Sequence, residues 1–181
     1  LFSNFVSRGF RTIVFARARP TVEVILKYTR DLLKDKPVVS QGITSYRGGY
    51  MPEDRRQIEQ SLSKGELLGV TCTNALELGV DIGSLDVAVI NGYPGSIAST
   101  WQQAGRAGRR GRESLAVFVA TDEPLDQYLM RNPEYFFGAS VEHAIINPYN
   151  PYIQSMHLRA AAHEIPLSPS EEPLFGANFK K

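Results

Sequence analysis

Residues 102–111 combine arginines, glutamines and glycines in a pattern suited to binding phosphate. The segment reads Gln-Gln-Ala-Gly-Arg-Ala-Gly-Arg-Arg-Gly. The guanidinium of an arginine is planar and permanently charged, so its donors can pair with two phosphate oxygens at once. Arg106 and Arg109 are three residues apart, so both can project from one turn, and the glycines around them let the backbone approach a ligand. A solvated basic loop is the alternative that the arginines alone leave open.

The composition of the chain fits one α/β domain with a hydrophobic core. It has 181 residues, of which 43% are hydrophobic and 22% charged, and this length suits a single domain. No apolar run approaches the roughly 20 residues that span a bilayer, and residues 1–11 lack the apolar region of a signal peptide. We therefore expect a cytoplasmic protein.

A single cysteine limits the metal and redox chemistry open to the chain. Cys72 excludes an internal disulfide and a cysteine-based zinc site, and its apolar neighbours predict a buried, inert thiol. The histidines do not have the spacing of metal ligands. We therefore expect no metal site formed by this chain alone.

Basic residues concentrate in the first part of the chain. Residues 1–112 hold sixteen Lys and Arg against ten Asp and Glu, a net charge of +6, whereas residues 113–181 hold four against nine, a net charge of −5. The basic part contains the arginine-rich segment, which is compatible with a face that binds phosphates.

Short β-branched segments alternate with segments of helical periodicity over residues 12–121. This alternation predicts a parallel sheet covered by helices on both faces, and ligands bind such sheets at the carboxyl ends of the strands. The predicted strands are residues 12–15, 43–46, 67–71, 86–90 and 115–120, and the predicted helices are residues 20–33 and 52–62, with helical turns near 74–78 and 99–104.

The pattern changes after residue 121. It predicts short helices at 124–130 and 133–137, a turn-rich break at 147–151, a helix at 152–163 and a loose tail over 165–181. The predicted organisation is a domain of residues 1–121 followed by a helical extension of residues 122–181.

Four blocks of sequence resemble, in order, motifs of the superfamily 2 helicases. Residues 12–19 resemble motif IV, residues 45–49 the block that follows it, and residues 70–81 motif V. Residues 102–109 match every fixed position of motif VI, Gln-x-x-Gly-Arg-x-Gly-Arg. The resemblance implies the second RecA-like domain of a helicase, an α/β three-layer sandwich in which helices flank a parallel central sheet.

A narrower resemblance extends to nearly the whole chain from residue 12. Residues 113–130, 147–152 and 157–167 are similar to those of the mitomycin-repair DNA helicases, which are DEAD/DEAH-type enzymes related to the fungal RecQ-four-like helicases and carry a C-terminal metal-binding domain with a cysteine cluster. The chain has no phosphate loop Gly-x-x-x-x-Gly-Lys-Ser/Thr, no Asp-Glu-x-His box and no cysteine cluster. The resemblance therefore implies half of a motor, inactive alone, whose partners are the first RecA-like domain and the metal-binding domain.

In such motors ATP and Mg²⁺ sit between two RecA-like domains and are held mainly by the first. The resemblance makes Arg109 the arginine finger on the γ-phosphate and Arg106 its companion, and such fingers raise NTPase rates roughly 10³- to 10⁵-fold. It implies that Gln102 binds the nucleotide or couples it to the domain interface, and that Gly79 and Asp81 approach the ribose and sense domain closure. A turn or cap residue is the alternative role of Asp81.

The other face of such a motor binds single-stranded DNA through backbone phosphates, without base readout. Thr73, at a strand-to-helix turn, fits such a contact, and Arg17, Ser45 and Arg47 are the further candidates. The alternatives are a strand end for Ser45 and solvated side chains for the two arginines. Trp101 could stack on a base, although packing at the edge of the core is the stronger expectation.

The sequence thus predicts the second motor domain of an ATP-dependent DNA helicase with a role in DNA repair. An RNA helicase is the alternative within the same class, because phosphate tracking ignores the base. A non-catalytic nucleic-acid adaptor and an α/β module that binds a nucleotide sugar or a phosphoprotein are alternatives of other classes. The last of these leaves four ordered blocks unexplained, and no Gly-x-Gly-x-x-Gly follows the first strand.

Overall fold

The computed structural model of the chain describes residues 1–83, 85–108, 113–142, 147, 150–176 and 179. It divides into two compact units, Leu1–Glu142 and His143–Lys181. Each unit has its own hydrogen bonds and is described by itself.

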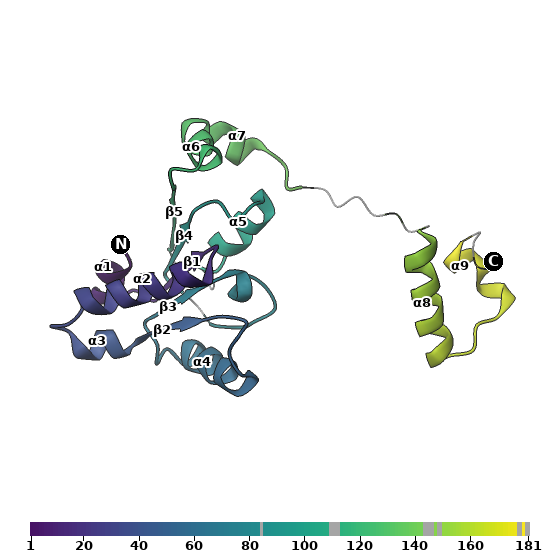
Figure 1. Cartoon of the computed structure of the whole chain (residues 1–181), viewed down its shortest axis with the longest axis horizontal. Helices are drawn as coiled ribbons and strands as arrows, with labels where there is room; N and C mark the ends of the chain where they lie inside the picture. Colours follow the sequence, from purple (N-terminus) through teal and green to yellow (C-terminus); the bar gives the residue numbers. More distant parts are fainter. Residues whose placement is uncertain (84, 109–112, 143–146, 148–149, 177–178, 180–181) are drawn as a thin grey trace. The chain divides into compact units, whose positions relative to one another are not determined.

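The first unit is built on a sheet of five parallel strands. These are β1 (Thr12–Ala16), β2 (Ile43–Tyr46), β3 (Gly69–Cys72), β4 (Val87–Asn91) and β5 (Leu115–Val119), in the order β2-β3-β1-β4-β5 (Figure 1). Every neighbouring pair is parallel, so all five carboxyl ends lie along one edge. The predicted strands are confirmed, with β3 beginning at Gly69 rather than at residue 67.

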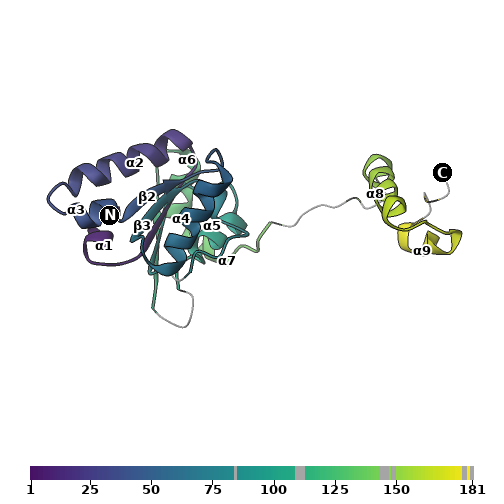
Figure 2. The same cartoon turned by 90° about the horizontal axis from the view of Figure 1, so that it is seen from below.

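Helices cover both faces of the sheet, as predicted for a three-layer α/β fold (Figure 2). Side chains of β1 alternate between two hydrophobic clusters: Ile13 and Phe15 belong to one, and Val14 to the other. The first cluster includes residues of α4 (Pro52–Lys64), η1 (Asn74–Leu76) and α5 (Ile97–Ala104). The second includes residues of α1 (Phe2–Ser7), α2 (Arg19–Leu32) and α3 (Pro37–Gln41).

The sequence did not predict α1 or α3. Both are short, and α3 contains two adjacent valines, which favour a strand in isolation. In the fold, Phe2 and Val6 of α1 are 5% and 0% exposed and pack over β3, so tertiary packing rather than local propensity holds this helix.

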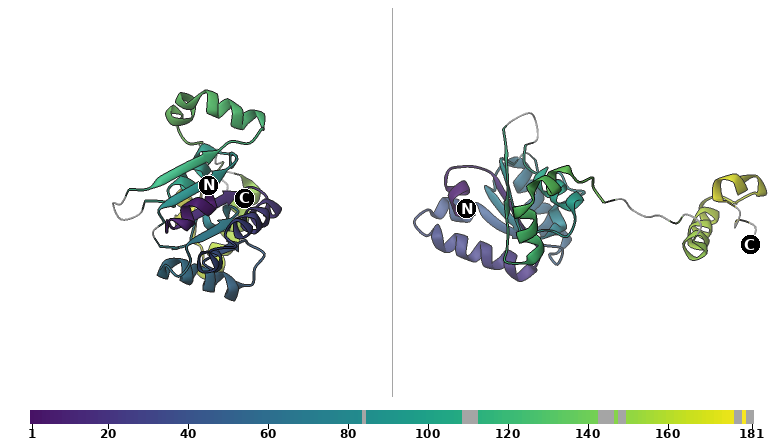
Figure 3. Two further views of the ribbon diagram at one scale, coloured as in Figure 1. Left: turned by 90° about the vertical axis from the view of Figure 1, so that its left-hand side faces the viewer. Right: turned by 90° about the horizontal axis from the view of Figure 1, so that it is seen from above.

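Two further helices, α6 (Pro124–Arg131) and α7 (Pro133–Gly138), follow β5 and belong to the first unit (Figure 3). The Asp126 side chain of α6 is 1% exposed. Its carboxylate accepts hydrogen bonds from the backbone N–H of Tyr93 at 3.0 Å and of Thr121 at 2.8 Å. The compact unit therefore runs past residue 121, where the sequence pattern changes, and ends at Glu142.

The second unit contains α8 (Pro151–Glu164), η2 (Pro169–Glu171) and α9 (Glu172–Phe175). The Asn150 side chain caps α8, and the Gln154 side-chain amide donates to the Phe175 carbonyl. The segment predicted as a loose tail thus holds two short elements, the first of them fixed by a capping box between Ser168 and Glu171. None of the described helices has the length and apolarity that a membrane span requires.

Candidate functional site

The strand order brings the four predicted DNA-binding residues to one edge of the sheet. Arg47, Thr73 and Arg17 are the first residues after β2, β3 and β1, which are consecutive neighbours, and Ser45 lies within β2. Adjacent strands are about 4.8 Å apart, so β2 and β1 end about 10 Å from each other. We call Arg17, Ser45, Arg47 and Thr73 the phosphate track.

The Arg17 guanidinium is exposed and paired with a carboxylate of its own chain. Its Nη1 donates to Glu123 Oε2 at 2.7 Å, and the two side chains are 56% and 59% exposed. Glu123 precedes α6 and lies 106 residues further along the sequence. Arg17 is therefore exposed, as expected if it were only a solvated side chain, but it also pairs with the carboxylate of Glu123.

A second carboxylate serves Arg47 and Ser45. Glu23 of α2 lies 3.6 Å from Arg47 Nε and accepts a hydrogen bond from Ser45 Oγ at 3.2 Å. Ser45 is 4% exposed, and its hydroxyl also lies 2.5 Å from the Tyr50 hydroxyl. The Arg47 guanidinium stacks 5.0 Å above the Tyr50 ring. Ser45 is thus a buried anchor of this cluster, and Arg47 is its accessible cation.

Polar side chains line a cavity of ≈ 150 Å³ at the carboxyl ends of β1 and β4. A second cavity, of ≈ 330 Å³, shares Arg17, Asn91 and Gly92 with the first. Asn91 and Ser99 were not predicted as site residues, because neither belongs to a charged or glycine-rich motif. The first cavity is lined by Arg17, Asn74, Asn91, Ser99 and Gln103, among others.

The loop after β3 carries the remaining motif V residues. Thr73 is half-buried and precedes η1. Gly79 is exposed and has φ +76°, and a Cβ built there would meet no atom within 4 Å. The carboxylate of Asp81 accepts from the backbone N–H of Gly83 at 3.1 Å. The turn role that was the alternative for Asp81 is therefore present, while its role toward a nucleotide stays a prediction.

Arg106 is buried and donates to the backbone of that same loop. It is 6% exposed. Its Nε donates to the Glu77 carbonyl at 3.0 Å and its Nη1 to the Val80 carbonyl at 2.8 Å, and Nη2 also donates to the Glu77 carbonyl. In this conformation the Arg106 side chain joins the segment after α5 to the loop that contains Gly79.

The two glutamines that begin the arginine-rich segment differ sharply in environment. Gln102, predicted to bind the nucleotide, is exposed. Gln103 is 3% exposed, and its Nε2 donates to the Glu77 carboxylate at 2.9 Å. Ser99 Oγ donates to the same oxygen at 2.6 Å. Glu77, which the sequence did not single out, is therefore the common partner of three residues in and after α5.

A carboxylate supports the other end of α5. The Glu142 side chain accepts from the backbone N–H groups of Ile97 at 2.6 Å and Ala98 at 3.0 Å. The hydrogen bond from Ala98, followed by that from Ile97, lowers the pKa of Glu142 below its ordinary value. The Ser96 hydroxyl caps the same helix by accepting from Ser99 N.

The remaining predicted residues are Arg109, Trp101 and Cys72. Arg109 lies outside the described residues, and its role as the arginine finger stays a prediction.

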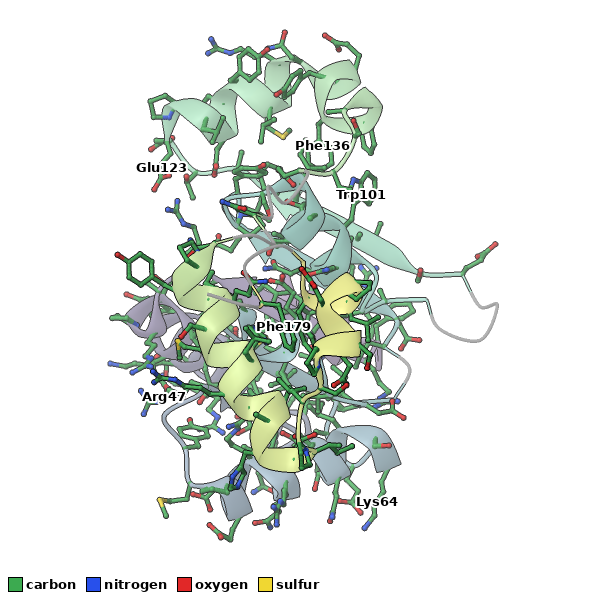
Figure 4. All side chains as sticks on the ribbon, turned by 90° about the vertical axis from the view of Figure 1, so that its right-hand side faces the viewer. Arg47, Lys64, Trp101, Glu123, Phe136 and Phe179 are labelled. Atoms are coloured by element: carbon green, nitrogen blue, oxygen red, sulfur yellow. The ribbon has the colours of Figure 1, made fainter. Side chains whose placement is uncertain are left out.

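Trp101 is 42% exposed and stacks on Phe136 with ring centroids 5.5 Å apart (Figure 4). The packing expected of Trp101 is therefore present, although it leaves part of the ring accessible. The Cys72 thiol is buried as predicted, and burial raises its pKa well above the ordinary value.

Comparison with protein families matches residues 1–111 to the family described as "Helicase conserved C-terminal domain". The chain belongs to this helicase family. The ATP-dependent helicase YprA of Bacillus subtilis is 55% identical over 177 residues, which cover 98% of this chain and 23% of the relative. The ATP-dependent helicase hrq1 of Schizosaccharomyces pombe is 40% identical over 179 residues, which cover 97% of this chain and 17% of the relative. The chain thus spans less than a quarter of the length of either relative.

Solved helicase structures share the fold of the chain. The crystal structure of the DUF1998 helicase MrfA bound to DNA and AMPPNP has a TM-score of 0.88 at 54% identity, covering 97% of this chain and 24% of that one. The helicase Lhr of Mycobacterium smegmatis bound to ssDNA and AMP-PNP has a TM-score of 0.71 at 26% identity, covering 88% of this chain and 21% of that one. The predicted RecA-like fold and the predicted membership of the superfamily 2 helicases are confirmed.

Proposed function

We propose that this chain is the second motor domain of an ATP-dependent DNA helicase that acts in DNA repair. The observation that carries the proposal is the phosphate track: Arg47, Thr73 and Arg17 follow three adjacent strands at one sheet edge. Groups placed at regular lateral spacing along one edge suit a ligand with regularly spaced charges, and a nucleic-acid backbone is such a ligand.

On the DNA face, Arg17 and Arg47 bind successive backbone phosphates and the Thr73 hydroxyl contributes a neutral donor. Each arginine exchanges its carboxylate partner, Glu123 or Glu23, for a phosphate. Such a surface reads no bases, so binding is electrostatic and independent of sequence. The buried Ser45 hydroxyl supports the Arg47 side of the track through Glu23.

On the nucleotide face, the chain completes a site whose phosphate loop and Mg²⁺ ligands belong to another RecA-like domain. The residues present fit a nucleotide. Gly79 has no Cβ, so its exposed backbone is open to a ligand. Asp81, in the same motif V block, and Gln102, at the start of motif VI, are also exposed. Arg109 supplies the arginine finger and Arg106 positions the loop that contains Gly79. Bound ATP with Mg²⁺ supplies the phosphoryl group whose developing charge such an arginine stabilises.

DNA rather than RNA is proposed as the ligand because both solved complexes named above contain DNA. The phosphate track itself contacts neither base nor sugar, so an RNA helicase is the second candidate function. Parallel titrations with single-stranded DNA and RNA of one sequence separate the two, since a preference for RNA would reverse the assignment.

The proposal is tested by measuring nucleic-acid binding and ATP turnover of the 181-residue chain. We expect weak binding of single-stranded DNA at low ionic strength that fades steeply towards physiological salt. Because the chain has no Gly-Lys-Ser or Gly-Lys-Thr sequence, we expect no ATP turnover. Arg17→Ala and Arg47→Ala should each weaken binding, whereas Arg8→Ala, before the amino end of β1, is the matched control. Equal losses in all three variants, or turnover by the chain alone, contradict the proposal.

A further inference from the structure

We infer that the outer edge of β5 is an interface, which an extended segment of the longer helicase polypeptide covers by adding a strand to the sheet. The inference uses the proposed function only in treating the chain as one domain of a longer enzyme. In the described sheet β5 comes last in the order β2-β3-β1-β4-β5 and pairs with β4 alone. Its outer side has no role in the proposed binding of DNA or nucleotide.

The register of β5 identifies the backbone groups that point outward. At its two ends, the Leu115 N–H donates to the carbonyl directly before β4 at 3.0 Å, and the Val119 carbonyl accepts from the N–H directly after β4 at 2.9 Å. In a parallel pair, alternate residues direct both backbone groups to the same neighbouring strand. The backbone groups of Leu115, Val117 and Val119 therefore face β4, whereas those of Ala116 and Phe118 face away from it. No donor or acceptor of the described residues pairs with these outward groups.

The opposite edge of the sheet is closed by the fold itself. There the N–H of Gly69 donates to the Gly42 carbonyl, so the Ile43 carbonyl of β2 points away from β3. The Arg30 guanidinium of α2 donates to that carbonyl at 2.9 Å, and the Ile43 side chain is fully buried. Three of the four residues of β2 are buried. The domain thus covers one edge of its sheet and leaves the other accessible.

The sequence of β5 lacks the devices that keep an open edge from pairing. Edge strands are commonly protected by charged residues or proline, but β5 reads Leu-Ala-Val-Phe-Val, a composition that favours strand pairing. Leu115 is 46% exposed and Ala116 is also exposed, whereas every residue of β1 and β3 is buried. An exposed apolar edge of this kind is what an added strand recognises.

A cavity of ≈ 280 Å³ at the amino end of β5 indicates the chemistry of the added strand. Its apolar lining includes Phe5, Phe10 and Leu115, and its carboxylates are those of Asp86 and Glu113. A lysine or arginine suits such a cavity, because its apolar stem can pack on the rings while its cationic head reaches the carboxylates. The expected occupant is therefore an extended apolar segment with a basic residue beside Leu115.

The length of the relatives favours a segment of the same polypeptide as the occupant. The 177 residues matched in YprA are 23% of that protein, and a tethered segment binds at an effective concentration of roughly millimolar. A second copy of the chain suits this edge less. If two β5 strands paired antiparallel about Val117, Glu113 of each copy would oppose Thr121 of the other, next to Asp122, and like charges would meet.

The test compares amide hydrogen exchange in the full-length enzyme and in the 181-residue chain. The N–H groups of Ala116 and Phe118 should exchange at least about 100-fold more slowly in the full-length enzyme, because only there does an added strand accept from them. The N–H groups of Leu115, Val117 and Val119 should exchange slowly in both proteins. They are internal controls, since their slow exchange shows that the sheet is folded.

Ala116→Pro removes one outward N–H and leaves the hydrogen bonds to β4 in place. In the full-length enzyme it should speed exchange at Phe118 at least about tenfold, while the Tm of the 181-residue chain stays within about 4 °C of the wild type. Val117→Pro is the matched control, because it removes an inward N–H and should lower the Tm of both proteins.

Glu113→Gln tests the basic residue of the added strand without a change in the backbone. It should speed exchange at Ala116 and Phe118 in the full-length enzyme about two- to fivefold, the effect of one exposed ion pair. Glu53→Gln is its matched control, because Glu53 is an exposed carboxylate of α4, and it should leave exchange at both positions unchanged.

Rapid exchange at Ala116 and Phe118 in the full-length enzyme overturns the inference, because the edge is then open. Slow exchange at both positions in the 181-residue chain also overturns it: the cover then lies within these residues, or is a second copy if the slowing grows with protein concentration. Protection that survives both Ala116→Pro and Glu113→Gln excludes strand addition. None of these results depends on DNA binding or ATP turnover, so failure of the proposed function is seen separately.

Discussion

Each arginine of the phosphate track is balanced by one carboxylate of the same chain. Glu123 pairs with Arg17 and Glu23 with Arg47, and Figure 4 labels Arg47 and Glu123. Exposed ion pairs contribute little stability, so these carboxylates are poorly explained as supports of the fold. Under the proposed function, they would compete with an incoming phosphate and hold the guanidinium groups in place until one arrives, so we expect them to influence DNA affinity.

We therefore predict that Glu123→Gln raises the affinity of the chain for single-stranded DNA. The expected gain is about two- to fivefold, the range that one exposed ion pair supplies. The effect should vanish in the Arg17→Ala background, because Glu123 acts through Arg17. Titrations of the wild type, both single variants and the double variant at one salt concentration measure this coupling.

Asp31→Asn is the control, since it breaks an exposed ion pair between Asp31 of α2 and Lys34, which follows that helix. Additive effects of Glu123→Gln and Arg17→Ala on DNA affinity would mean that Glu123 acts by long-range electrostatic repulsion of DNA and not through Arg17.

Asp126 provides a second prediction, this one on stability. Burial favours the neutral form, but hydrogen bonds from the N–H and hydroxyl of Thr121 and the N–H of Tyr93, with the charge of Arg17, lower the pKa of Asp126 below its ordinary value. A folded-state pKa below the unfolded value of about 3.9 stabilises the fold above about pH 4. This stabilisation is lost as the pH falls through the folded-state pKa.

Asp126→Asn should lower the free energy of unfolding at pH 7 by about 1–3 kcal/mol, because its NH₂ group cannot replace an acceptor. Urea denaturation from pH 7 down to pH 3 should show the difference from wild type narrowing below about pH 4. If the difference in free energy of unfolding between Asp126→Asn and wild type stayed constant from pH 7 to pH 3, the charge of Asp126 would not contribute to stability.

The sequence predicted cations for the site but did not predict the side chains and carbonyls that pair with them. Arg17, Arg47 and Arg106 stand in recognisable motifs, whereas Glu123 lies 106 residues from Arg17 and Glu77 lies 29 residues from Arg106. Such pairs depend on strand order, which no local pattern specifies. For the same reason, sequence reasoning treated Arg106 as a companion of the arginine finger, while its observed donors bind backbone carbonyls.

At the scale of elements, periodicity predicted most of the strands and longer helices, and the alternation of the two predicted the parallel sheet. It did not predict that β3 lies between β2 and β1, which is the arrangement that aligns Arg47, Thr73 and Arg17. It also missed α1, whose place is set by a glycine. A Cβ on Gly69 of β3 would come within 2.6 Å of the Phe2 ring and 2.9 Å of Val6.

Gly69→Ala should therefore destabilise the domain by overpacking, by about 1–3 kcal/mol. Gly48→Ala is the matched control, because a Cβ at Gly48 meets no atom within 4 Å. Urea denaturation midpoints of the two variants make the comparison. If Gly69→Ala were as stable as Gly48→Ala, α1 would not be packed on β3 as observed.

At the scale of the molecule, residues 1–112 carry a net charge of +6 although the whole chain carries only +1. Arg17 and Arg47 therefore lie in a region of net positive charge. The salt dependence of DNA binding should be proportional to the number of phosphates that the domain neutralises. The proposed function divides the arginines of this region into two groups: Arg17 and Arg47 serve DNA, and Arg109 serves ATP. Salt dependence can separate the two groups, because each phosphate contact contributes its own share of the slope.

We predict that Arg47→Ala lowers the slope of log affinity for single-stranded DNA against log salt by about one phosphate contact. Arg109→Ala should leave that slope unchanged, because the role proposed for Arg109 is toward the nucleotide and not toward DNA. Both substitutions remove one positive charge from residues 1–112, so each is the other's control for net charge. Titrations of the wild type and the two variants at several salt concentrations decide the matter. Equal losses of slope would mean that the DNA face and the nucleotide face are one continuous basic surface, and Arg109 would then have to be counted among the residues that bind DNA.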